Sequence, residues 1–144
     1  MAIIKNILAL DVGQVRIGVA VASLVAKMPR PLTTINSSSE VYADIQKLAD
    51  EQDAQIIVVG LPRGLDGQTT EQTNITDNFI MELKQNTNLQ IYKQDEALTS
   101  KKAKEELESK GRPYSKEDID ALAATYILED FLHENADRLK QVQQ

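Results

Sequence analysis

The stretch LALDVGQVRIGVAVA, residues 8–22, predicts two strands joined by a tight turn. An apolar run from Ile7 to Leu10 is typical of a strand that is buried on both faces. Valine and small residues dominate from Val15 to Val21, which indicates a second strand. Gly13 lies between the two runs and permits the tight turn of a hairpin. The sequence therefore opens with an antiparallel pair of strands.

Beyond residue 22, short apolar runs alternate with segments of helical spacing. The aliphatic run from Ile56 to Val59 ends at Gly60, as expected of a central strand. The sequence predicts strands at 7–10, 15–21, 32–35, 56–59 and 89–92, and helices at 41–49, 75–83, 99–111 and 119–127. An antiparallel start followed by β-α units implies an α/β fold, with a mixed five-stranded sheet and helices on both faces.

Several polar residues carry signals for helix starts. Ser37 and Glu40 have the spacing of a capping box, in which side chains and backbone N–H groups exchange hydrogen bonds. Thr69 or Thr70 can cap the second helix, and Ser115 can cap the last one. The expected apolar face of the second helix consists of Ile75, Phe79 and Leu83.

Length and composition limit the function classes. The chain has 144 residues, of which 42% are hydrophobic and 26% charged, so we expect one globular domain over 1–134 and a polar tail over 135–144. The absence of cysteine and the single histidine, His133, exclude disulfides, thiolate zinc sites and multi-histidine metal sites. No apolar run approaches the roughly 18 residues of a membrane span, so we expect a cytoplasmic protein without membrane contact.

The charge distribution is uneven. The net charge of −6 argues against a simple nucleic-acid binder with a basic surface. Residues 100–116 nevertheless contain six basic and three acidic side chains. This segment is either a solvated helix or a surface that binds phosphate groups.

Carboxylates occur where two predicted strands end. Asp11 ends the first strand, and Asp95 and Glu96 follow the last one. A carboxylate at a buried strand end is costly unless it is paired, hydrogen-bonded or bound to a metal. The alternative for Asp11 is a turn-capping role before Gly13, and for the other two an ordinary loop at a helix start.

A third acidic spot lies at the start of the last helix. Glu117 and Asp120 are three residues apart and share one side of that helix, whereas Asp118 falls in the capping turn. Ligands collect at the carboxyl edge of parallel strands, so the three acidic spots can meet there. Oxygen ligands without histidine or cysteine suit Mg²⁺ or Mn²⁺, and two such ions about 4 Å apart can hydrolyse a phosphodiester.

The loop VVGLPRGLDGQTTEQT, residues 58–73, is a candidate phosphate site. Its glycines allow close approach to the backbone, and the N–H groups at the start of the following helix suit an anion. Arg63 can add a bidentate contact to a phosphate. The alternative is an ordinary β-α connection that needs glycines for its turns.

With these residues in view, the chain resembles the YqgF/RuvX family of pre-16S ribosomal RNA nucleases, formerly described as Holliday-junction-resolvase-like proteins. Five stretches carry the resemblance in the order of the family: LALDVGQVRIGVAVA, PLTTI, IIVVGLPRGLDG, DEALTS and DIDALAATYIL. The resemblance implies an RNase H-like fold. It also implies divalent-metal phosphodiester hydrolysis in the 5′ processing of small-subunit ribosomal RNA.

The resemblance also assigns residues by position. Asp11, Glu96 and Asp120 match the catalytic and metal-binding carboxylates of the family. We add Glu117 as a candidate fourth metal ligand. Thr99 matches a threonine of the family's motif. The expected phosphate-binding residues are Arg16, which matches the arginine of the opening motif, together with Arg63, Lys101 and Lys102.

Two positions depart from the family's pattern. Ala97 stands where the family usually has arginine, and Ala22-Ser23 stands in place of Ser-Asp. The loss of the arginine weakens phosphate contacts unless a nearby lysine replaces it, for which Lys93, Lys101 and Lys102 are the candidates. The three proposed metal carboxylates are intact, so we expect an active nuclease.

Three substrates or partners stay open at this point. The leading hypothesis is an endonuclease on structured RNA such as pre-16S ribosomal RNA. The second is a nuclease on branched DNA, which requires two active sites on a homodimer, whereas RNA cleavage is open to a monomer. The third is a non-catalytic RNA-binding module that works with ribosomal assembly components. An actin-like ATPase needs a second related domain, for which 144 residues leave no room.

Overall fold

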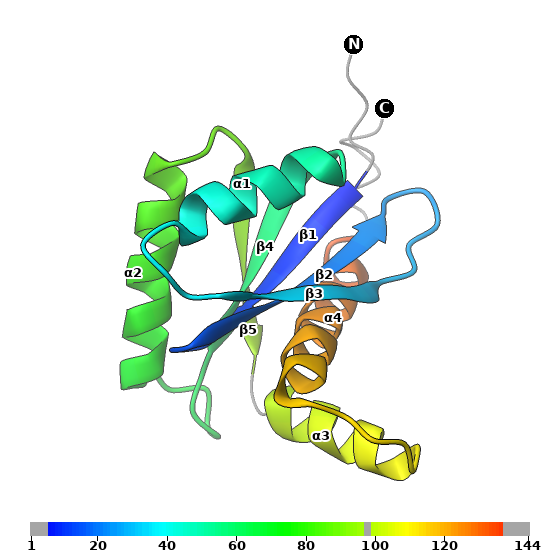
Figure 1. The fold of residues 1–144 in the computed structure, drawn as a ribbon. Coiled ribbons are helices and arrows are strands. Elements are labelled where there is room, and N and C mark those ends of the chain that lie inside the picture. The colour runs from blue at the N-terminus through cyan, green and yellow to red at the C-terminus, as the bar shows by residue number, and fades with distance from the viewer. Residues whose placement is uncertain (1–5, 97–98, 137–144) are drawn as a thin grey trace.

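The computed structural model describes residues 6–96 and 99–136, with the backbone alone for 99–101. The elements in chain order confirm the predicted alternation (Figure 1). They are β1 (Asn6–Val12), β2 (Arg16–Ser23), β3 (Arg30–Asn36), α1 (Val41–Glu51), β4 (Ala54–Pro62), α2 (Glu71–Gln85), β5 (Gln90–Glu96), α3 (Thr99–Ser109) and α4 (Lys116–Glu134).

The strands form one mixed sheet in the order β3-β2-β1-β4-β5. β2 is antiparallel to both β1 and β3, whereas β1, β4 and β5 run parallel. The carboxyl ends of the three parallel strands therefore lie at one edge of the sheet. Because β2 is antiparallel and Val12 pairs with Ile17, β2 begins at that same edge. The predicted five-stranded mixed sheet is confirmed.

Side chains of the central strands alternate between two apolar cores. Leu8 and Leu10 point to the face that α1 and α2 cover, whereas Ile7 and Ala9 point to the face that α4 covers. Figure 1 shows α1 and α2 on one side of the sheet and α4 on the other. Helices thus cover both faces, as the sequence predicts.

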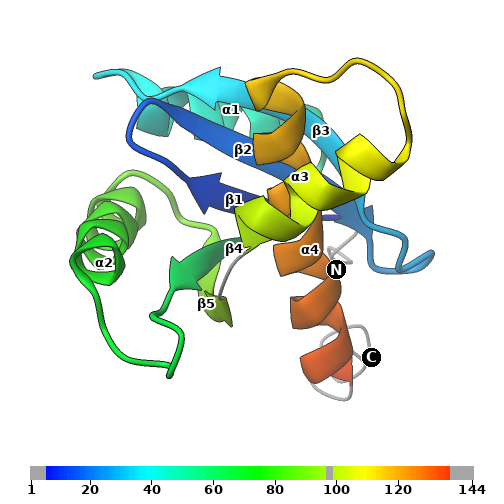
Figure 2. The same ribbon diagram turned by 90° about the horizontal axis from the view of Figure 1, so that it is seen from below.

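α4 lies between the sheet and α3 (Figure 2). Ile127 and Phe131 pack on the sheet, while Leu122 and Tyr126 pack with Ala103 of α3. This position explains why α4 has buried residues around most of its circumference. Within the described residues, no helix is both long and apolar enough to cross a membrane.

Two local predictions are wrong, and one is confirmed for a different physical reason. Ser37 and Glu40 form no capping box, because α1 begins after Glu40 without a side-chain cap and Ser38 accepts the Glu40 N–H. Ile75 is exposed, because α2 turns threonines toward the sheet instead. Gly13 lies in the predicted tight turn, where its N–H donates to the carbonyl oxygen of Arg16 at 2.9 Å. Its φ is not positive; the glycine is required because a β-carbon there would lie 2.7 Å from that same oxygen.

Candidate active site

α4 contacts the sheet at two glycines. A β-carbon on Gly18 would lie 1.9 Å from the carbonyl oxygen of Asp120, and one on Gly60 would lie 2.3 Å from Cδ1 of Ile127. The helix backbone therefore rests directly on β2. At the start of the helix, the Thr34 hydroxyl donates to the carbonyl oxygen of Glu117 at 2.8 Å. These contacts fix where the first turns of α4 lie over the sheet.

The close contact at Gly18 brings Asp120 to Asp11. Gly18 pairs directly with Asp11 across the antiparallel ladder. Asp11 lies two residues beyond Ala9, so its side chain points to the α4 face. Burial and then the charge of Asp120 raise the pKa of Asp11 from 3.8 to about 6. Two of the predicted carboxylates thus meet at the carboxyl edge of β1.

Arg16 pairs with one of these carboxylates. Its Nε–H donates to Oδ2 of Asp120 at 2.7 Å, and the two side chains are only 25% and 21% exposed. The hydrogen bond to Asp120 raises the pKa of Arg16, and the charge of Glu117 adds to that effect. Arg16 reaches this place because it begins β2 at the carboxyl edge of β1 and faces α4.

A pocket of about 360 Å³ lies beside this pair. Its lining consists of Gly13, Gln14, Val15, Arg16, Lys116 and Asp120. The β1–β2 turn therefore forms one wall, and the first turns of α4 contribute the other. The pocket lining therefore includes two cationic side chains, Arg16 and Lys116, and one carboxylate, Asp120.

Glu96 lies on the same face of the sheet but joins a different group. It pairs with Pro62 at the end of β5, two strands away from β1, which is a separation of about 10 Å across the ladder. Burial, a hydrogen bond with Asp130 and the charges of Asp130 and Glu134 raise its pKa to about 9, against an opposing effect of Lys102. Its Oε1 is buried without a hydrogen-bond partner among the described residues. The structure does not bring Glu96 to Asp11 and Asp120.

The other acidic candidates have separate positions. The Glu117 side chain is exposed on α4. Asp118 accepts the Ser115 N–H at 2.9 Å and completes a capping box, which confirms the local role expected for it. Asp95 is 66% exposed and accepts a hydrogen bond from Arg63 at 3.1 Å.

Arg63 is held within its own loop. Besides the contact with Asp95, its Nη1 donates to Oγ1 of Thr69 at 2.9 Å, and its backbone N–H donates to the carbonyl oxygen of Glu96. Thr70 caps α2, as one of the two sequence alternatives predicts. The guanidinium therefore braces the connection from β4 to α2 near the end of β5.

The predicted lysines differ in what they contact. Lys102 Nζ lies 4.4 Å from the centre of the Tyr126 ring, a cation–π contact between α3 and α4. Lys93 pairs with Asp77 at 2.7 Å on the α2 side of the sheet, so it does not replace the missing arginine beside Glu96. The side chain of Lys101, Ala97 and the side chain of Thr99 lie outside the described residues.

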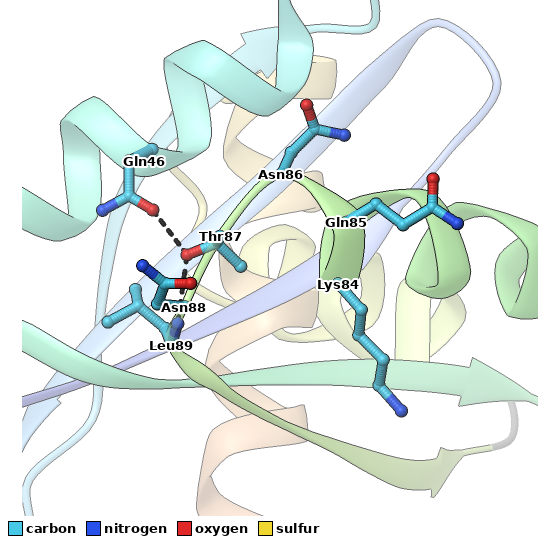
Figure 3. Close-up of a pocket in the computed structure, with 7 residues that line it drawn as sticks. All are labelled: Gln46, Lys84, Gln85, Asn86, Thr87, Asn88 and Leu89. Atoms are coloured by element: carbon cyan, nitrogen blue, oxygen red, sulfur yellow. Dashed lines mark hydrogen bonds between the residues drawn. The ribbon is translucent and has the colours of Figure 1, made fainter.

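A second pocket, of about 610 Å³, lies at the opposite edge of the sheet (Figure 3). Its lining joins Gln46 of α1 to the connection between α2 and β5, and the Thr87 hydroxyl donates to Oε1 of Gln46 at 2.5 Å. It contains no carboxylate, and it lies where β5 begins rather than where it ends. The carboxyl edge is therefore the better candidate for the active site.

A family model identifies the family of this chain. The model described as "RuvX: Holliday junction resolvase" matches residues 5–134, which is most of the chain. The chain belongs to the RuvX family. The predicted resemblance is therefore confirmed.

Curated proteins similar to this RuvX chain carry nuclease names. A Pseudomonas putida protein named "Putative pre-16S rRNA nuclease" is 34% identical over 140 residues, covering 94% of this chain and 99% of the relative. Proteins of the same name from Rickettsia typhi and Chloroflexus aurantiacus are 37% and 38% identical and cover 90% and 88% of this chain and 85% of each relative. These names agree with the predicted enzyme class.

Solved structures similar to the RuvX chain support its fold. Thermus thermophilus RuvC in complex with a Holliday junction substrate has a TM-score of 0.53 and 15% identity, and the match covers 90% of this chain and 95% of that chain. At this identity the likeness shows the fold alone. The predicted RNase H-like fold is confirmed.

Sequence reasoning missed the residues that position the RuvX carboxylates. Gly18 sits inside a strand, where an isolated glycine indicates close backbone approach, and that signal was present. Asp130 and Glu134 face Glu96 from the far half of α4, and they carried no signal because solvent-facing acids are common on helices. The sequence alone gives no reason to connect them with β5.

Proposed function

We propose that this protein is a divalent-metal-dependent endonuclease that hydrolyses phosphodiester bonds, and that residues 1–134 form its single nuclease domain. The observation that carries the proposal is the pair Asp11 and Asp120, two half-buried carboxylates at one edge of the sheet; burial, and then the charge of Asp120, raises the pKa of Asp11 to about 6. Such a pair is stabilised by a cation. Family membership supports the reaction class.

The donor set fits Mg²⁺ or Mn²⁺. Asp11 and Asp120 offer hard oxygen ligands, and the guanidinium of Arg16 already stands beside them as a cation. Within 6–96 and the described part of 99–136, no group of three or more acidic or histidine side chains could hold a metal. The proposed two-ion site therefore needs Glu96, with Glu117 as the additional candidate, to join the pair. Bound ions of this kind supply an activated water and stabilise the leaving oxygen.

The basic side chains position the substrate. Arg16 and Lys116 line the pocket beside Asp120, where their N–H groups can donate hydrogen bonds to phosphate oxygens. Arg63 lies in the connection from β4 to α2, where it contacts Thr69. Lys102 of α3 holds a further cation against Tyr126 of α4, and we assign substrate binding to Lys102 and Lys101 from the sequence. Positioning of this kind accounts for a large part of catalysis in phosphoryl transfer.

We propose structured RNA as the substrate, in the 5′-end processing of pre-16S ribosomal RNA during ribosome biogenesis in the cytoplasm. The names of the relatives support this choice. Branched DNA is the second candidate, which the family description favours. A symmetric cut across a four-way junction requires a homodimer with two sites, whereas RNA cleavage is open to a monomer.

The test is cleavage of labelled pre-16S RNA in Mn²⁺, beside a four-way DNA junction. We expect RNA cleavage that EDTA, Asp11→Asn and Asp120→Asn each abolish, while Asp53→Asn, an acid far from the carboxyl edge, retains it. Cleavage of the junction alone would assign the second substrate. RNA binding without cleavage by the wild type would instead indicate a module that works with ribosomal assembly components.

A further inference from the structure

At the candidate site, Arg16 forms an ion pair with Asp120. The proposed reaction gives these two residues different partners: a phosphate for Arg16 and a divalent cation for Asp120. Nε of Arg16 donates to Oδ2 of Asp120, an oxygen that a divalent cation would also require. Arginine stays charged at every physiological pH, so loss of a proton cannot remove this competitor. An ion that binds through that oxygen meets the positive charge of the guanidinium at hydrogen-bond distance from its own ligand, so the two cations compete for Asp120.

We propose that Arg16 competes with the divalent cation for Asp120, and that cation binding transfers the guanidinium from Asp120 to a substrate phosphate. The inference rests on the proposed function and deepens it. Arg16 thereby becomes the residue that couples cation binding to substrate binding at one site.

The pocket beside the pair supplies the place for the phosphate. Arg16 and Asp120 both line it, and Lys116 adds a second cation from the first turn of α4. While Asp120 is paired with Arg16, its negative charge opposes a phosphate in this space. Once a divalent ion neutralises Asp120, two cationic side chains face the phosphate.

The exchange has a thermodynamic consequence. If the cation frees Arg16 for phosphate, phosphate binding frees Asp120 for the cation by the same factor, because coupling between two ligands is reciprocal. Cation and substrate then bind with positive cooperativity. Without Arg16, the cation meets no competing guanidinium, and the part of the coupling that depends on this exchange is lost.

The first experiment measures Mn²⁺ affinity by titration calorimetry without nucleic acid. Arg16→Gln should bind Mn²⁺ about two- to fivefold more tightly than the wild type, which corresponds to the loss of one competing ion pair. Lys116→Gln removes the same charge from the same pocket without touching Asp120 and should change affinity less. Arg30→Gln, an exposed arginine of β3, should leave it unchanged.

The second experiment measures the affinity for a phosphorothioate RNA hairpin with and without Mn²⁺. Mn²⁺ should tighten RNA binding by the wild type, and it should do so by a clearly smaller factor in Arg16→Gln, in which only direct contacts between the ion and the phosphate couple the two ligands. Arg16→Lys keeps the charge but not the Nε–H fork, and it should restore only part of the factor.

The outcomes separate the two proposals. Mn²⁺ binding that Asp11→Asn weakens, together with unchanged or weaker affinity in Arg16→Gln, overturns the exchange and leaves the proposed function standing. Equal gains in Arg16→Gln and Lys116→Gln also overturn it, since long-range charge then accounts for both. If neither wild type nor variants bind Mn²⁺ at a site that needs Asp11, both proposals fail.

Discussion

The carbonyl oxygen of Asp120 lies 1.9 Å from the position that a β-carbon on Gly18 would occupy. No real side chain fits such a gap, so the distance between α4 and β2 depends on that glycine. Because Gly18 pairs with Asp11, the same contact sets the distance between the two carboxylates. The site therefore depends on a residue that carries no chemistry.

Gly18→Ala should push α4 away from β2 and separate Asp120 from Asp11. We expect a loss of about 1–3 kcal/mol in the free energy of unfolding and a loss of roughly tenfold or more in kcat/KM. Gly60→Ala is the matched control, because its β-carbon meets only the side chain of Ile127. It should lose comparable stability and keep more activity; equal activity losses would refute the positioning role of Gly18.

Asp11→Asn should stabilise the metal-free protein at neutral pH. The pKa of Asp11 rises from 3.8 to about 6 on folding, so the unfolded chain loses this proton first as pH rises. The difference in the free energy of unfolding between wild type and variant therefore stays constant below about pH 4. Between about pH 4 and 6 the wild type loses stability relative to the variant. At pH 7 the variant should be more stable by up to about 3 kcal/mol. Urea unfolding in EDTA at several pH values measures the difference, and a flat difference would contradict the assignment.

Added Mn²⁺ should make the wild type more stable than Asp11→Asn, the reverse of their order without metal. A ligand that binds only the folded state raises the free energy of unfolding by an amount that grows with its concentration. We expect the melting temperature of the wild type to rise with added Mn²⁺ and to return after EDTA. Asp11→Asn and Asp120→Asn should show little rise. An equal rise in all three proteins would show that the ion binds elsewhere.

Glu96→Gln and Asp95→Asn should differ sharply, although the residues are neighbours. Glu96 is half-buried with its pKa raised to about 9, whereas Asp95 is 66% exposed and contacts Arg63. We expect Glu96→Gln to stabilise the metal-free protein by an amount that grows between about pH 5 and 9, and to lower cleavage by a factor of at least ten. Asp95→Asn should change both only slightly. Parallel cleavage assays check this, and the reverse ranking would make Asp95 the functional carboxylate.

The sequence predicts the frame of this protein well, because its strands are short aliphatic runs with clear ends. The run from Ile56 to Val59, which ends at Gly60, is typical of a buried central strand, and β4 confirms it. The face of α2 was harder to predict. Thr73 and Thr76 are buried there while Ile75 is exposed, because the Thr73 hydroxyl donates to the carbonyl oxygen of Pro62. Hydrophobicity alone does not reveal a polar residue that is buried with its partner.

The candidate site was predictable only in part for a similar reason. Asp11 and Asp120 could be placed at one edge from topology, and the structure brings them together. Glu96 shares their face by strand alternation, yet its carboxyl group meets Asp130 and Glu134 instead. The position of that side chain depends on the angle at which α4 crosses the sheet, and that angle depends on contacts at Gly18 and Gly60. No local pattern encodes a crossing angle.

The Arg16–Asp120 contact joins residues that are 104 positions apart in the chain. During synthesis the amino-terminal strands emerge first, and they lack a cover on one face until α4 follows. Hydrolytic capacity therefore arises late, when the last described helix docks. A chain that stalls before this helix emerges would expose Ala9 and Ala20 to solvent and have no functional site. The docking of α4 would then both bury this apolar face and complete the site.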